Sequence, residues 1–153
     1  VFFFFFGSNM ASELGGMRQK EHIDAMDIMG VNTYNFLIGP KVLGGILVIP
    51  MLVTVGAAIS ILGGYLASVP TGMLSADQYI QGLNSFFIPF NVILMLIKAV
   101  VFSYILTSVS CYQGYYVKGG SIELGKASTR AVVISDILIL VADYILALLL
   151  ATK

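Results

Sequence analysis

Three charged side chains occur inside long apolar runs of the sequence, and their charges allow them to neutralise one another. Lys98 lies within residues 86–112, whereas Asp136 and Asp143 lie within residues 131–152. An ionised Lys or Asp at the centre of a membrane-spanning helix costs about 2.5 to 3.5 kcal/mol on insertion scales, so a partner is expected. Asp136 and Asp143 are seven residues apart and share a helical face, which an antiparallel neighbour carrying Lys98 can meet. We expect Lys98 to pair with Asp143; in the alternative, Lys98 and Asp136 extend to opposite membrane surfaces.

The other residue types that could do chemistry form no catalytic or metal-binding pattern. Cys111 is the only Cys, which excludes a disulfide framework and a Cys-based zinc site. His22 is the only His, and one imidazole beside Glu21 and Asp24 is a poor metal site. The segment 120–127 misses the phosphate-binding loop pattern because it ends in Ala, which has no hydroxyl for magnesium. We therefore expect neither an enzyme nor a metal site.

The composition indicates a membrane protein. Of the 153 residues, 58% are hydrophobic and only 10% are charged, and the mean hydropathy is +0.95. A soluble domain carries about 25% charged residues, so an ordinary cytosolic domain is excluded. Eight Lys and Arg balance eight Asp and Glu. Because no basic field results that could neutralise phosphates, we expect no binding to nucleic acid.

Three apolar runs are long enough to cross a bilayer as helices, for which about 20 residues suffice. They are residues 42–69, 86–112 and 131–152. The predicted fold is therefore all-α: one polytopic membrane domain with three transmembrane helices.

The basic residues near these spans are unevenly distributed, which predicts an orientation. They are Arg18, Lys20 and Lys41 before the first span, and Lys118, Lys126 and Arg130 between the second and third. The positive-inside rule places both segments in the cytoplasm. The connection 68–85 contains Asp77 and no basic residue, so we expect it outside, together with Lys153.

Small residues recur at every fourth position of the first span, at Gly56, Ser60 and Gly64. Helices in lipid use such ridges for close backbone contact. The pattern fits a contact within one subunit or a contact between two copies equally well.

An amphipathic helix is predicted before the first span, over residues 12–29, with Gly30 as its C-terminal stop. Arg18, Glu21 and Asp24 are spaced three apart and share its polar face. Such a helix either lies on the surface in solvent or docks into a groove on a cytoplasmic partner.

The same stretch, residues 13–31, resembles the coupling-helix region of the MlaE family, the permease subunits of MCE-type lipid ABC transporters. That family typically shows E-[IL]-G-x-M-[RK]-x-x-E-Q-I-D-A-L-x-x-M-G. Two positions depart from it, with His22 in place of Gln and Met26 in place of Leu. The matching positions that the resemblance implies for coupling to an ATPase are Glu13, Gly15, Met17, Arg18, Glu21, Asp24 and Gly30.

Further matches extend the resemblance over residues 7–153. Lys98 is similar to an intramembrane lysine of the family, residues 125–133 resemble its last cytoplasmic loop, and Asp143 falls in its final helix. The resemblance implies a homodimer in the bacterial inner membrane that moves phospholipid or related lipid between membranes. Its implied partners are a cytoplasmic ABC ATPase, which binds ATP and magnesium, and a periplasmic MCE-domain protein. No cofactor is implied for this chain itself.

The first residues depart from the family. Residues 1–6 would rise only about 9 Å as a helix, against about 30 Å of hydrocarbon, so they cannot span a membrane alone. The N-terminal interfacial helix and first two membrane helices of the family have no counterpart in the sequence. We therefore expect the domain, residues 1–153, to be N-terminally truncated. The alternative function is a membrane scaffold or truncated remnant without transport activity.

Overall fold

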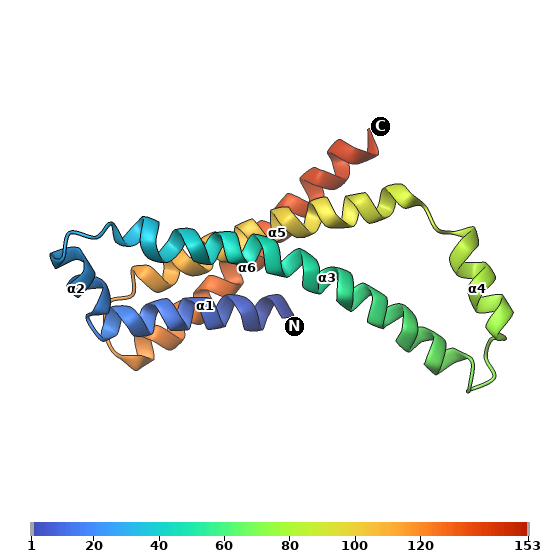
Figure 1. Ribbon diagram of the computed structural model, residues 1–153, viewed down its shortest axis with the longest axis horizontal. Coiled ribbons are helices and arrows are strands. Elements are labelled where there is room, and N and C mark those ends of the chain that lie inside the picture. Colours follow the sequence, from blue (N-terminus) through green and yellow to red (C-terminus); the bar gives the residue numbers. More distant parts are fainter. Residues whose placement is uncertain (1, 153) are drawn as a thin grey trace.

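The computed structural model describes residues 2–152, and every regular element in that range is helical (Figure 1). Val1 and Lys153, and with them the expected outer position of Lys153, lie outside this range. The elements are α1 (Phe2–Gln19), α2 (His22–Ile28), a π-helical turn η1 (Tyr34–Ile38), α3 (Gly39–Ser68), α4 (Ala76–Ser85), α5 (Pro89–Tyr115) and α6 (Ser121–Ala151).

The predicted all-α membrane fold is confirmed. Three helical segments are long and apolar enough to cross a bilayer: Tyr34–Ser68, Pro89–Tyr115 and Ser121–Ala151. The last begins ten residues before the apolar run 131–152 predicted from the sequence. Hydropathy detects only the apolar part of a helix that lies in lipid. The first turns of α6 are polar but still helical, so hydropathy does not locate where the helix begins.

The single helix predicted over residues 12–29 is wrong, because the structure has two helices there. α1 already begins at Phe2 and ends at Gln19, and α2 begins at His22. Between them Glu21 takes the left-handed conformation with φ 58°, which is uncommon for a residue other than Gly. Lys20 and Glu21 stand between the two helices, and neither is the Gly or Pro that would signal a break in the sequence.

α5 is the central helix and packs against α1, α3 and α6. Its contact with α1 is close: a Cβ added at Gly114 would lie 2.6 Å from the backbone oxygen of Ala11. Nearby, a buried core joins Leu14, Ile23 and Tyr115, to which Leu37 and Cys111 also belong. This core draws α1, α2, the start of the first span and the end of α5 together.

The two halves of the molecule differ in packing. α3 and α5 lie against each other near α2 and separate toward α4, which connects them (Figure 1). α4 begins with a capping box in which Ser75 and Gln78 satisfy each other's backbone N–H groups. In the half of α3 that is nearer to α4, most large apolar side chains are exposed, as expected of surfaces that contact lipid or other protein.

Candidate functional site

The ion pair expected between Lys98 and Asp143 is present. Nζ of Lys98 on α5 lies 2.7 Å from Oδ1 of Asp143 on α6, and the two side chains are 29% and 47% exposed. Asp136 is exposed on α6 and forms no ion pair with any residue of the described chain. Lys98 therefore does not extend freely to a membrane surface, and of the two acids it selects Asp143.

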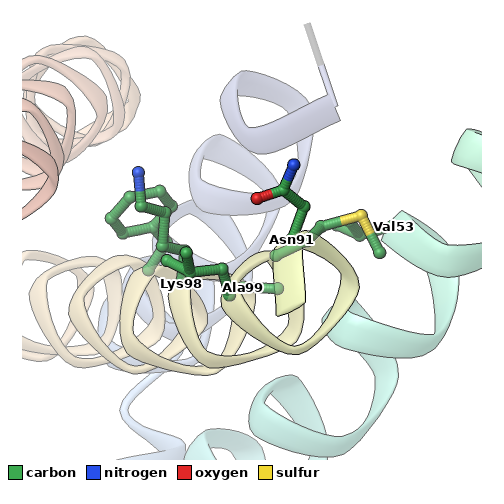
Figure 2. Close-up of a pocket in the computed structure, with 7 residues that line it drawn as sticks. Val53, Asn91, Lys98 and Ala99 are labelled. Carbon is green, nitrogen blue, oxygen red and sulfur yellow. The ribbon is translucent and has the colours of Figure 1, made fainter. Parts of the chain in front are cut away.

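Lys98 also lines a cavity of about 490 Å³ between α3 and α5. Its walls are mainly apolar, and its polar groups are the amide of Asn91 and the ammonium of Lys98. Figure 2 shows both projecting from one side of α5, with Val53 of α3 at the edge. The remaining lining residues are Leu94, Met95, Ala99 and Phe102. A cavity of this size and polarity fits an apolar chain that carries one polar or anionic group.

The residues matched to the coupling motif fall into two groups, and the first holds α1 in the bundle. Glu13 forms an ion pair with Lys41 at the start of α3, with 2.7 Å between Oε2 and Nζ. Gly15 is buried, and a Cβ there would collide with Leu124 of α6. Met17 packs against the buried core. Gly15 and Met17 thus pack α1 into the bundle, whereas the side chain of Glu13 stays 64% exposed beside its ion-pair partner.

The second group attaches and exposes α2. Arg18 at the end of α1 reaches Asp24 of α2, with 3.2 Å between Nη1 and Oδ1, and its guanidinium lies 5.7 Å from the ring centre of Tyr115. Ile23 inserts into the core. Glu21, which directly precedes α2, and most side chains of α2 are exposed, so Arg18 and Ile23 connect a largely exposed helix to the span α5.

The helical pattern of residues 12–29 places Ile28 and Met29 on its apolar contact side, but the structure exposes both. Ile28, the last residue of α2, is 87% exposed, and Met29, which follows it before the turn at Gly30 (φ +75°), is 70% exposed. Ile28 lies five residues after the buried Ile23, about 140° around the helix, and so faces away from the core. That spacing was the available signal.

In residues 2–152, Gly64 is the member of the small-residue ridge that has another helix packed against it. A Cβ at Gly56 would meet nothing within 4 Å, and Ser60 donates its hydroxyl hydrogen bond to the Gly56 backbone oxygen at 2.8 Å. Gly64 faces the Tyr79 hydroxyl of α4. The contact within one subunit is therefore restricted to Gly64, and the contact with a second copy stays a prediction. In residues 2–152 no group of three or more His, Cys, Asp or Glu could hold a metal ion.

These features define a multi-pass α-helical membrane protein with a short exposed helix attached at one end of its spans. The chain belongs to the permease MlaE family, whose model matches residues 2–149. It is 38% identical to a probable ABC transporter permease protein of Rickettsia bellii, over 92% of this chain and 54% of that protein. It is 30% identical to the intermembrane phospholipid transport system permease protein MlaE of Haemophilus influenzae, with the same coverage. It is 29% identical to the chloroplastic protein TRIGALACTOSYLDIACYLGLYCEROL 1 of Arabidopsis thaliana, over 92% of this chain and 40% of that protein. The chain spans about half the length of the bacterial relatives.

Proposed function

We propose that this chain is part of the permease of an ABC transporter that moves phospholipid or a related lipid between bacterial membranes, and that it resides in the inner membrane. The family membership, and the phospholipid transport for which the Haemophilus influenzae relative is named, support a lipid as the substrate. The observation that carries the proposal is the apolar cavity beside Lys98. An acyl chain fits its walls, and the ammonium offers an anionic headgroup a counter-charge.

Energy for this movement comes from a separate cytoplasmic ATPase in our proposal, and ATP and magnesium bind there. The exposed surface of α2 docks on that ATPase, with Glu21 and Asp24 as polar contacts and Ile28 as an apolar one. The Arg18–Asp24 ion pair and the buried Ile23 then transmit the movement of the ATPase from α2 to α5. A second copy of the chain and a periplasmic MCE-domain protein complete the assembly.

The experiment is site-specific photocrosslinking in membranes that contain the ATPase partner. A photoreactive amino acid at Val53 lies at the edge of the cavity, whereas one at Leu62 on the same helix is exposed and outside it. We expect the lipid crosslinked from position 53 to change in amount when ATP is added, and that from position 62 to stay constant. Equal behaviour at both positions would contradict the proposal and favour a scaffold that does not transport lipid.

A further inference from the structure

A second hollow, unrelated to the cavity beside Lys98, lies where α5 is connected to α6. Its volume is about 120 Å³. Three of its lining side chains are cationic and one is a carboxylate: Lys118, Lys126, Arg130 and Glu123. Gln113, Tyr116, Val117 and Ala127 complete its walls.

The positive charge of this hollow is only partly neutralised. Lys126 pairs with Glu123, with 3.0 Å between Nζ and Oε1. Lys118 and Arg130 form no ion pair with any residue between positions 2 and 152. Two cations are therefore left for an external anion, and one small hollow brings them together.

The backbone around the hollow is held in place by the end of α1. Nε2 of Gln19 donates a hydrogen bond to the backbone oxygen of Gly119 at 3.1 Å. Gly119 has φ +127°, a conformation that residues with a side chain rarely adopt. The connection that carries Lys118 is thus tied to a helix distant in sequence, which preorganises the hollow.

A shallow groove begins at the same cations and follows one face of α6, the helix that supplies all of its lining residues. It is about 570 Å³ in volume, and Lys126 and Arg130 line both the groove and the hollow. Its apolar side chains are Ile122 and Val133, which are 75% and 52% exposed, and Ser121, Gly125 and Thr129 also line it. A cationic hollow next to an apolar groove matches a ligand with an anionic head and a hydrocarbon tail.

The position of the hollow fits the headgroup level of a membrane. It lies at the end of one spanning helix and the start of another, Pro89–Tyr115 and Ser121–Ala151. Tyr112 and Tyr116 are exposed beside it, and tyrosines are enriched at membrane interfaces. The positive-inside distribution assigns this end to the cytoplasmic leaflet, whose anionic lipids attract basic residues.

We propose that Lys118, Lys126 and Arg130 bind the phosphate of an anionic phospholipid of the cytoplasmic leaflet, while one acyl chain lies in the groove of α6. The groove distinguishes this ligand from an acidic protein surface, which would need the cations but no apolar channel. The site is separate from the cavity beside Lys98, and it does not depend on whether the chain transports lipid.

The test is lipid retention on the purified full chain in detergent, measured by native mass spectrometry with phosphatidylglycerol and phosphatidylcholine in turn. We expect phosphatidylglycerol to be retained in preference to phosphatidylcholine. Arg130→Gln and Lys118→Gln should each lower that retention about fivefold, the effect of one basic residue near a charged surface. Lys118 lies in the connection outside both helices, so its variant tests the site even if Arg130→Gln inserts poorly. Lys20→Gln is the matched control, because Lys20 is exposed and lines neither hollow nor groove.

Four results would overturn the proposal. Equal retention of the two lipids, or equal retention by Arg130→Gln and Lys20→Gln, would show that the cations select no anionic lipid. Displacement of phosphatidylglycerol by inorganic phosphate at equal concentration would show that a free phosphate is the ligand and that the groove contributes nothing. Loss of the ATPase partner from Arg130→Gln with unchanged lipid retention would identify the hollow as a protein contact.

Discussion

At the scale of single residues, the position of Lys98 serves two purposes. Its ammonium is bound by Asp143 across the α5–α6 contact, and its side chain also lines the cavity shared with α3. The ammonium of Lys98 therefore links α5 to α6 and is also accessible to a molecule in the cavity. An anion that binds there competes with Asp143 for the ammonium.

Replacing either partner leaves the other charge without its counter-ion in a largely apolar environment. We expect Lys98→Met and Asp143→Leu each to lower the free energy of unfolding by about 1 to 3 kcal/mol, the cost of leaving such a group unpaired. The double variant should lose less than the sum of the two, which thermal unfolding in detergent can measure. Asp136→Leu is the control, since Asp136 has no ion-pair partner in residues 2–152.

Glycine at position 114 permits the close approach of α1 to α5. A Cβ there would lie 2.6 Å from the Ala11 backbone oxygen, and backbone cannot move aside as a flexible side chain can. We expect Gly114→Ala to destabilise the protein by about 1 to 3 kcal/mol, the usual cost of overpacking. Gly16→Ala, where nothing lies within 4 Å, should be neutral or slightly stabilising. Similar melting temperatures for the two variants would contradict this account of the α1–α5 contact.

At the scale of elements, α2 combines a buried anchor with an exposed apolar end. Ile28 is 87% exposed, so Ile28→Asp removes no contact that the fold depends on. We expect this variant to reduce co-purification of the ATPase at least about fivefold, as loss of a central apolar contact does at protein interfaces. Met73→Asp is the matched control, because Met73 is 81% exposed in the connection at the opposite end of α3. Unchanged co-purification with Ile28→Asp would exclude the end of α2 as the docking surface.

The elements also show what the sequence could and could not predict. The three spans follow from apolar length alone, and the Lys98–Asp143 pair follows from the cost of charge in lipid and the spacing of the acids. The break between α1 and α2 does not follow, because Glu21 supplies the left-handed turn where a Gly would have signalled it. The burial of Gly15, which matches the coupling motif of the family, does not follow either, because it depends on the packing of α1 on α6.

Unlike the three spans, the two pockets could not be predicted from the sequence. The sequence groups Lys118, Lys126 and Arg130 in one basic segment, but only the folded connection brings them to one hollow with a groove along α6 beside it. Likewise the cavity beside Lys98 requires Val53, which is 45 residues earlier in the chain and is placed there by the packing of α3 on α5. Residue type can be read from a sequence, whereas convergence of distant residues depends on packing.

At the scale of the whole molecule, the open ridge of α3 predicts how two copies meet. Gly56 has open space in front of it in this chain, so a close neighbour must come from elsewhere. In a Cys111→Ala background we expect Gly56→Cys to form a disulfide between two copies in membranes. Ala58→Cys should not, because Ala58 is exposed about 200° around the same helix. Non-reducing electrophoresis distinguishes the two, and crosslinking from both positions would indicate random collision.

The unequal packing of the two ends has a mechanical consequence. The spans are packed together near α2 and diverge toward α4, and α3 alone is 30 residues, about 45 Å long. A rotation of only about 5° at the packed end displaces the far end of α3 by about 4 Å, given that length. A displacement too small to break the Arg18–Asp24 ion pair is thus amplified along the helix, and the far end of the molecule makes the largest movement.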